Sequence, residues 1–336
     1  MLAHFQFSFN AVAPMLVLIL VGCVIRRGRI FPESFFPDIN RLIFKFFLPV
    51  MLYNGIYNIE SLPSVNWGAA AVCVAGIFLM FGVGYLAQRF LIPDLRQKGA
   101  IWQCMFRSNF ALIGLPLAQS LGGDAALAFG AVISAFVQLS FNSLAVIALT
   151  SASSDDREQR LRKIGGQMIR NPMIIASLLG LATLGLRMVI PQGADGALVF
   201  SIRKDLPFLY TAIGNAAKVA SPLAMVALGA QFSFPRERTD VKPMAVGVIG
   251  RLVVGPILGL SLAWLAARAG LVRFGASEYP AVIALFGTPV GVSSAVLVQS
   301  AGGDVKLANQ LVVFTSILSM FTLVVLISVV KGLGLL

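Results

Sequence analysis

The sequence predicts an all-α integral membrane protein in which ten transmembrane helices form two inverted repeats of five, with helices 4 and 9 broken. Three observations support this prediction. The composition is strongly apolar, Lys and Arg gather in alternate loops, and the motif at Gln119–Asp124 returns as Gln299–Asp304. Each copy of the motif closes an apolar stretch that Gly and Pro interrupt.

The composition defines the class of protein. Of the 336 residues, 58% are hydrophobic and 12% are charged, and the mean hydropathy is +0.87. Apolar runs of about 20 residues have the length of a helix that crosses the hydrocarbon core of a bilayer, which is about twice the length of a barrel strand. We expect such spans at about 9–26, 38–57, 67–91, 100–120, 126–150, 168–189, 206–231, 243–268, 279–299 and 306–330.

The polar stretch Ser151–Gln167 divides these spans into two halves. We therefore expect a first five-helix repeat at 1–150, a linker at 151–167 and a second repeat at 168–336. Within the repeats, Lys45 and Pro49 in span 2 match Lys218 and Pro222 in span 7. Because each half has an odd number of helices, the second half enters the membrane upside down relative to the first. Such inverted repeats, with a site near the bilayer midplane, are typical of secondary transporters that work by alternating access.

The distribution of Lys and Arg predicts the orientation in the membrane. Sixteen lie in one set of loops: Arg26, Arg27, Arg29, Arg41, Arg89, Arg96, Lys98, Arg157, Arg160, Arg162, Lys163, Arg170, Arg236, Arg238, Lys242 and Lys306. Six lie in the opposite set: Arg187, Arg203, Lys204, Arg268, Arg273 and Lys331. By the positive-inside rule the first set and the linker face the cytoplasm, so both termini lie outside. We expect a multi-pass protein of a bacterial inner membrane, and the net charge of +12 then reflects topology rather than nucleic-acid binding.

Two spans contain Gly and Pro at matching places in the repeats. Span 4 contains Gly114 and Pro116, and span 9 contains Gly287, Pro289 and Gly291. A proline inside a helix removes a hydrogen bond, and the freed carbonyl is costly in hydrocarbon unless protein or water satisfies it. An ordinary proline kink explains one such span, but two in repeat-related positions favour unwound backbone near the bilayer centre. The resulting half-helix ends suit an anion.

Polar side chains gather around both predicted breaks. Asparagine is the most informative of them, because its amide both donates and accepts hydrogen bonds in a dry site. Serine and threonine are weaker signals, since their hydroxyls often bond back to their own helix. The predicted substrate-binding residues are Arg107, Asn109, Gly114, Pro116, Asn142, Thr288, Pro289, Gly291 and Ser293, with Ser108, Ser294 and Thr315 nearby.

Four basic residues lie inside predicted spans, whereas the acidic residues fall in loops or at span ends. An unpaired cation in a span costs at least about 2.5–3.5 kcal/mol on insertion scales. One explanation is structural: the cation neutralises the carboxyl-terminal end of a half-helix or reaches the interface. The other is an anionic substrate, which the planar guanidinium of Arg107 suits, although Arg107 also fits a cytoplasmic vestibule. We assign Lys45, Lys218 and Arg251 to structural or electrostatic support.

The same residues argue against several other chemistries. His4 is the one histidine, and the three cysteines have no metal-ligand spacing, so we expect no metal and no cofactor. An intramembrane enzyme needs a nucleophile or an acid–base pair within the spans, and the sequence offers none. Proton relays usually use acidic residues or histidine. Coupling to H⁺ through a lysine of lowered pKa is one alternative, and coupling to Na⁺ is the other.

Several motifs resemble the auxin efflux carrier family. They are Ile39-Asn-Arg41 followed by Leu48-Pro49, and Asn109-Phe-Ala-Leu-Ile-Gly-Leu-Pro116 followed by Gly-Gly-Asp124. The resemblance covers essentially the whole chain and, with the short central loop, is strongest to the bacterial malonate and malate carriers of the family, which are distant relatives of the plant PIN carriers.

The resemblance implies the bile-acid-carrier type of fold, in which spans 4 and 9 cross at their breaks. It implies a scaffold from spans 1, 2, 6 and 7, a moving part from spans 3–5 and 8–10, and a homodimer. Asn109 matches the crossover asparagine of the family, and Pro116 and Pro289 match its crossover prolines. Lys45 departs from the apolar residue expected in plant carriers, which favours a small or highly charged acid over auxin.

We therefore expect elevator-type transport of a small organic anion, a mono- or dicarboxylate such as malonate or malate. A sodium-coupled, bile-acid-type organic anion symporter, an efflux carrier for an auxin-like aromatic carboxylate, and a sensor that binds without transport remain as alternatives.

Overall fold

The computed structural model describes residues 2–32, 34–150, 170–190, 200–231 and 240–336. These residues are helical almost throughout, and the extended pairing among them is a single bridge between Ser108 and Val290. The predicted linker at 151–167 lies outside the described residues. The all-helical prediction is therefore confirmed for the part of the chain that the structure describes.

Helices of the first half occupy the first five predicted ranges. Span 3 is a single helix, and span 2 is continuous through a π-helical turn at Ile43–Phe47. The long helix α6 covers the end of span 4 and all of span 5, with a bend at Gly122 and Gly123. The helices are α1 (Leu2–Arg27), α2 (Phe35–Leu42), α3 (Leu48–Tyr57), α4 (Trp67–Leu91), α5 (Leu95–Phe106) and α6 (Leu115–Thr150).

Helices of the second half occupy the other five ranges. Span 8 is again continuous through a π-helical turn, at Gly250–Val254, and span 9 is split. The helices are α8 (Pro172–Leu186), the short α9 (Ile202–Asp205), α10 (Pro207–Gln231), α11 (Val241–Ile249), α12 (Gly255–Arg268), α13 (Glu278–Gly287), α14 (Ser293–Ser300) and α15 (Val305–Gly332).

Six helical stretches among the described residues are long and apolar enough to cross a membrane by themselves. They are Ala3–Arg27, Trp67–Leu91, Phe110–Leu149, Pro207–Gln231, Val241–Arg268 and Val305–Gly332. Pro172–Leu186 and Glu278–Gly287 are apolar but shorter. This is the construction of a multi-pass membrane protein, because in hydrocarbon each backbone polar group must be satisfied within the chain. The count of ten spans and their inverted symmetry stay predictions.

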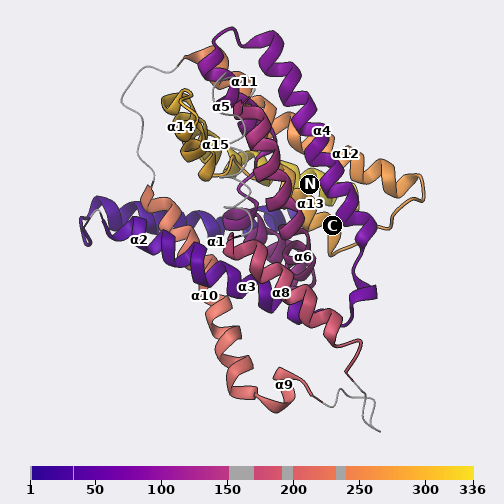
Figure 1. Ribbon diagram of the computed structural model, residues 1–336. Coiled ribbons are helices and arrows are strands. Elements are labelled where there is room, and N and C mark those ends of the chain that lie inside the picture. Colours follow the sequence, from indigo (N-terminus) through magenta and orange to yellow (C-terminus); the bar gives the residue numbers. More distant parts are fainter. Residues whose placement is uncertain (1, 33, 151–169, 191–199, 232–239) are drawn as a thin grey trace.

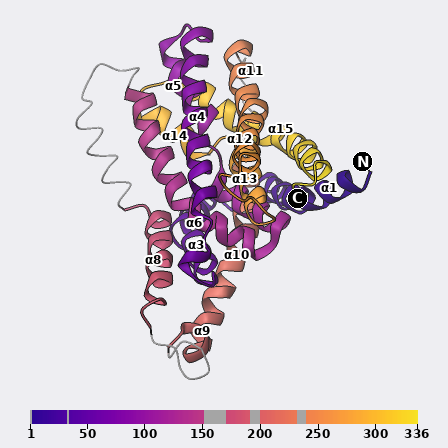
Figure 2. The ribbon, with the colours of Figure 1, turned by 90° about the vertical axis from the view of Figure 1, so that its right-hand side faces the viewer.

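The helices pack in two groups. In one, α1, α2, α3, α8 and α10 contact each other; in the other, α4 and α5 contact each other and α11–α15. Figure 1 shows the first group across the lower part of the molecule and most of the second above it, and Figure 2 shows the same division from the side. The two groups meet where α1 contacts α15 and where α6 contacts both α3 and α13.

The helices α1 and α10 of the first group approach each other closely at two glycines. A Cβ on Gly229 would lie 1.9 Å from the carbonyl oxygen of Ile19, and a Cβ on Gly22 would lie 2.0 Å from that of Val226. The two backbones therefore touch directly, which is the close approach that small residues allow in membranes. Cys23 and Arg26 add hydrogen bonds from α1 to the carbonyl oxygens of Gly229 and Ala230.

Three π-helical turns each end two residues before a proline. The turns are Ile43–Phe47 before Pro49, Phe110–Gly114 before Pro116, and Gly250–Val254 before Pro256. Proline donates no N–H to the preceding turn, and a wider turn absorbs that lost hydrogen bond without unwinding the helix. The prediction of unwound backbone at Gly114–Pro116 is therefore wrong.

Candidate functional site

The two broken helices cross at the centre of the molecule. After α5 the chain is non-helical at Arg107–Asn109, upstream of the predicted position, and after α13 it leaves the helix at Thr288. The second break matches its prediction. The crossing segments pair as in an antiparallel sheet, since the amide of Asn109 donates to the carbonyl of Pro289 (2.7 Å) and that of Gly291 to Arg107 (3.0 Å).

A side chain of α15 satisfies a further backbone group of the crossing. The amide of Val290 donates to Oγ1 of Thr315 on α15 at 3.2 Å. A Cβ on Gly291 would lie 3.2 Å from the carbonyl oxygen of Ser108, so a larger residue would crowd the pairing. Unpaired backbone groups are costly away from water, and this pairing supplies the partners that a helix would otherwise provide.

Arg251 stabilises the carboxyl-terminal ends of both broken helices. Its side chain is fully buried, and it donates to the carbonyl oxygens of Leu285 (2.9 Å), Phe286 (2.7 Å) and Thr288 (2.9 Å) at the end of α13. It also donates to the carbonyl oxygen of Met105 near the end of α5 (3.1 Å). Helix carboxyl termini carry unpaired carbonyls and partial negative charge, so a cation here has a structural task.

A cavity of about 770 Å³ lies against the crossing. Its lining comes from the crossing segments, the π-helical turn of span 2, α6 and the start of α8. The lining contains three basic residues and no acidic residue among the described ones. The lining residues are Phe44, Lys45, Arg107, Ser108, Asn109, Ala111, Gln138, Phe141, Asn142, Arg170, Asn171, Pro172, Met173, Gly291, Val292 and Ser293.

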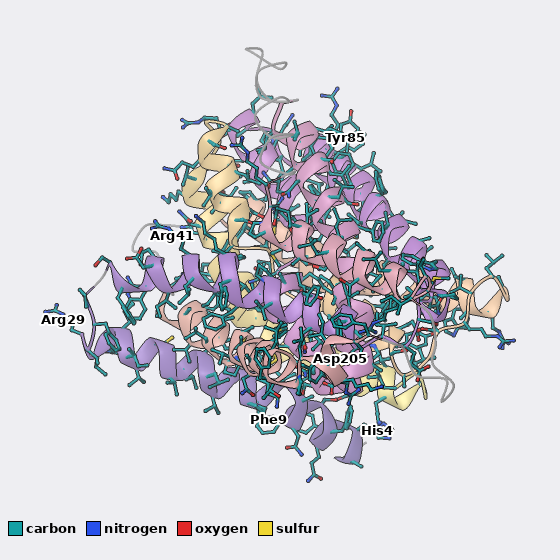
Figure 3. The ribbon with its side chains drawn as sticks, turned by 60° about the horizontal axis from the view of Figure 1, so that its bottom comes forward. His4, Phe9, Arg29, Arg41, Tyr85 and Asp205 are labelled. Carbon is teal, nitrogen blue, oxygen red and sulfur yellow. The ribbon has the colours of Figure 1, made fainter. Side chains whose placement is uncertain are left out.

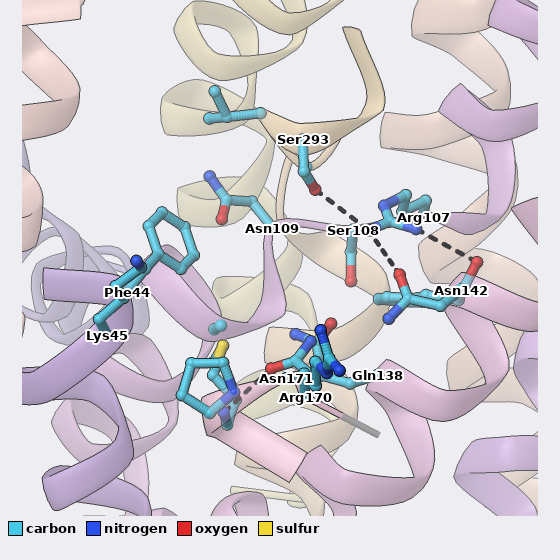
Figure 4. A pocket seen from close by; sticks show the side chains of 16 residues that line it. Phe44, Lys45, Arg107, Ser108, Asn109, Gln138, Asn142, Arg170, Asn171 and Ser293 are labelled. Carbon is cyan, nitrogen blue, oxygen red and sulfur yellow. Dashed lines mark hydrogen bonds between the residues drawn. The ribbon is translucent and has the colours of Figure 1, made fainter. Parts of the chain in front are cut away.

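Arg107 is 6% exposed and has only neutral partners. One NH group donates to the carbonyl oxygen of Phe141 at 3.2 Å. The other donates to Oδ1 of Asn142 at 3.0 Å and to Oγ of Ser293 at 3.1 Å. Figure 4 shows these side chains along one side of the cavity. The guanidinium is thus held by α6 and α14, while its positive charge meets no carboxylate among the described residues.

Asn109 and Ser108 carry polar groups that the described residues leave unpaired. Both side chains are 5% exposed, and neither Nδ2 of Asn109 nor Oγ of Ser108 has a hydrogen-bond partner there. Figure 4 shows both reaching from the crossing towards the space between Lys45 and Arg107. Buried polar groups in proteins are normally paired, so unpaired donors in a cavity point to a ligand or water.

The structure brings six of the predicted residues together around this cavity: Lys45, Arg107, Asn109, Asn142, Gly291 and Ser293. The others lie outside its lining. Gly114 packs against the carbonyl of Ala284, where a Cβ would approach to 3.1 Å, and Oγ1 of Thr288 bonds back to Ala284. Pro289 contributes its carbonyl to the crossing. Pro116, Lys218 and Arg251 are also absent from the lining, and Lys218 is exposed on α10.

Three polar lining residues were not predicted: Gln138, Arg170 and Asn171. Asn171 caps α8 by accepting a hydrogen bond from the amide of Met173 at 2.9 Å. Asn171 directly precedes Pro172, and an Asn-Pro pair in a sequence indicates the start of a helix rather than a binding site. Arg170 was counted among loop charges, since its contact with the cavity depends on how α8 packs.

The described residues contain no group of His, Cys, Asp and Glu that could hold a metal ion. The cavity lining contains neutral amides, hydroxyls and cations, which are partners for an anion. A family model described as "Membrane transport protein" matches residues 7–327.

The chain belongs to this membrane transport protein family.

It is the auxin efflux carrier-like family that the sequence motifs suggested, so that prediction is confirmed. No protein with a curated description matches the chain. Membership of the family makes the protein a multi-pass membrane transporter and argues against an enzyme.

Proposed function

We propose that this transporter carries a small organic anion, a mono- or dicarboxylate such as malonate or malate, through the cavity beside the helix crossing. The observation that carries the proposal is the charge of the cavity. Lys45, Arg107 and Arg170 line it without an acidic residue among its described lining. Arg107 is buried, so its charge attracts an anion more strongly than a cation in water does, and the exposed Lys45 and Arg170 add further positive charge.

The unpaired polar groups of the crossing support the same substrate class. A carboxylate accepts hydrogen bonds, and Nδ2 of Asn109 is a buried donor without a partner among the described residues. Arg107 lies beside it, and its planar guanidinium suits a carboxylate. Arg170 and Asn171 at the start of α8 line the same cavity and suit a second carboxylate. A dicarboxylate would thus contact residues from both helix groups.

We propose elevator-type alternating access by ten spans in two inverted repeats. The packing of the helices supports this mechanism, because α1–α3, α8 and α10 form one group and α4, α5 and α11–α15 form another. These correspond to the scaffold and moving part of the family resemblance. The backbone pairing of the two crossing segments would move the site as one unit within the second group.

The position of the cavity supports an inward-facing arrangement in a bacterial inner membrane, with both termini outside. Its lining residues on spans 2, 4, 5, 6 and 9 fall in the halves of those spans predicted to face the cytoplasm. A homodimer is part of the same proposal, and its test is the mass of the detergent-solubilised protein.

Reconstituted transport tests the function. Purified protein in liposomes should take up labelled malonate or malate above the rate of protein-free liposomes. Losing one hydrogen bond to a charged ligand costs about 1.5–3 kcal/mol, so Asn109→Ala should weaken binding by about 10- to 150-fold. Asn215→Ala is the matched control, since Asn215 is exposed on α10. If Asn109→Ala and Arg107→Ala both left transport unchanged, the proposed site would be wrong.

The coupling ion and the alternative substrates need a separate measurement. A ligand that binds the folded carrier raises its apparent stability. We expect thermal stabilisation by dicarboxylates and not by indole-3-acetate. Stabilisation that requires Na⁺ would favour a sodium symporter of the bile-acid type, and dependence on pH alone would favour H⁺ coupling.

A further inference from the structure

A second, larger cavity forms a groove between α1, α15 and the loop before α2. Its volume is about 1550 Å³, twice that of the cavity at the crossing. Figure 2 shows α1 and α15 beside each other, and the two helices are in contact. The lining residues are Phe5, Phe9, Leu16, Ile19, Leu20, Cys23, Arg26, Arg27, Arg29, Ile30, Phe31, Pro32, Phe36, Ser316, Ile317, Met320, Phe321, Val324 and Val325.

The body of the groove is apolar and open. Phe321 is 71% exposed, Val325 is 63% exposed and Leu20 is 61% exposed. In a protein of a membrane transporter family such a surface faces lipid chains. The lining of α1 runs from Arg27 back to Phe5, a rise of about 33 Å that covers a hydrocarbon core about 30 Å thick. The part from Arg27 to Leu16 rises by about 16 Å, which is one leaflet. The part of the groove next to the arginines therefore matches the reach of an acyl chain from one membrane surface.

One end of the groove is basic. Arg27 and Arg29 are both exposed, and neither has an ion pair with another described residue. The lining contains no acidic residue among the described ones. Figure 3 shows Arg29 at the far end of α1, extending away from the helix. Two cations beside an apolar groove at the edge of a bilayer are complementary to an anionic headgroup.

The backbone at Arg29 adds an independent observation. Arg29 has φ of 50°, and it is the one non-glycine residue with positive φ in the described chain. The helix ends there as helices usually end at glycine, with the amide of Ile30 donating to the carbonyl of Ile25. This cap ends α1 and turns the chain at Arg29, two residues beyond Arg27, so both arginines stand at the same end of the groove.

We propose that this groove binds an anionic phospholipid, with its phosphate on Arg27 and Arg29 and its acyl chains along α1 and α15. A second copy of the chain is a poorer occupant. In a symmetric dimer the second copy would place its own groove against this one. That surface contains no described carboxylate that could pair with Arg27 and Arg29. Because α1 and α15 belong to different helix groups, the lipid would contact the boundary between them.

The test compares lipids of different charge. The protein in detergent is titrated with dioleoyl-phosphatidylglycerol or dioleoyl-phosphatidylcholine, and bound lipid is counted by native mass spectrometry. Each basic residue near an anionic surface contributes about a factor of five, so Arg27→Gln with Arg29→Gln should weaken phosphatidylglycerol binding about 30-fold. Arg89→Gln with Lys242→Gln is the matched control, because both are exposed, lie on the same predicted side and are absent from the groove.

Three results would overturn the proposal. Equal binding of the two lipids, or unchanged phosphatidylglycerol binding by the Arg27 and Arg29 variant, would remove the charged contact. Displacement of the lipid by inorganic phosphate at similar concentration would make the groove a site for a free anion. Efficient disulfide cross-linking between two copies through Phe321→Cys, in a background without the native cysteines, would assign the groove to a second copy. Loss of phosphatidylglycerol binding in the first variant alone supports the proposal.

Discussion

Replacing Arg251 by methionine should lower the stability of the protein rather than abolish substrate binding. The substitution keeps much of the side-chain volume and deletes four hydrogen bonds to carbonyl oxygens at the ends of α5 and α13. Each buried carbonyl left without a donor costs about 1–3 kcal/mol, which sums to about 4–12 kcal/mol. Removing a buried cation returns about 2.5–3.5 kcal/mol on insertion scales. The net loss is therefore roughly 1–9 kcal/mol.

The assay is unfolding of the purified protein in detergent, followed by tryptophan fluorescence. Trp102 is suitable, because it is 4% exposed on α5, one turn from the carbonyl of Met105. Arg107→Met is the comparison variant. It also deletes a buried guanidinium, but its partners line a cavity that water can enter, and two of them are side chains that can turn.

The two variants should separate stability from binding. Arg251→Met should lower the midpoint of unfolding more than Arg107→Met does, and Arg107→Met should weaken carboxylate binding more. The reasoning is refuted if Arg251→Met unfolds at the wild-type midpoint. It is also refuted if Arg251→Met folds normally and loses binding, because Arg251 would then belong to the ligand.

Three further predictions follow from other contacts. Gly229→Ala should destabilise the protein, since its Cβ would lie 1.9 Å from the carbonyl oxygen of Ile19. Gly214→Ala is the control on the same helix, because a Cβ there would meet nothing within 4 Å. It should be neutral or stabilising by about 1 kcal/mol in the same unfolding assay. Arg170→Gln should weaken binding of malonate by about 10-fold or more and change binding of acetate little, measured by calorimetry; equal effects would remove the second carboxylate contact. Ser293→Cys, in a background without native cysteines, should react with a membrane-impermeant maleimide added to inside-out vesicles, which expose the cytoplasmic side. Reaction only from the opposite side would reverse the proposed orientation.

Hydropathy predicted the helices well, because the length of a membrane span is set by the bilayer. The range 67–91 coincides with α4. Glycine and proline predicted the break after Gly287, where the chain leaves the helix at Thr288. The same signal failed at Gly114 and Pro116, because a π-helical turn absorbs the missing N–H.

The position of the first break could not be read from local sequence. Arg107, Ser108 and Asn109 contain neither glycine nor proline, and their non-helical conformation depends on pairing with Pro289 and Gly291 far along the chain. A break that depends on such long-range pairing becomes visible only in the folded structure, where Arg107–Asn109 lies against Pro289–Gly291.

The basic residues show the same limit. Lys45 and Lys218 match in the repeat, yet Lys45 lies in a π-helical turn against the cavity and Lys218 lies on the regular helix α10, outside it. Arg251 and Arg107 look alike in sequence, but one bonds only to backbone carbonyls and the other lines the cavity. The sequence shows which spans contain a basic residue, but the packing of the helices determines which of these residues lines the cavity.

The pairing at the crossing uses backbone atoms alone. The bonds from Asn109 to Pro289 and from Gly291 to Arg107 do not involve the side chains of Ser108 and Val290. A substitution at Ser108, which lines the cavity, can therefore alter the chemistry presented to a substrate while the backbone pairing is kept. A protein built in this way can acquire a new preference by small evolutionary steps, each of which still folds.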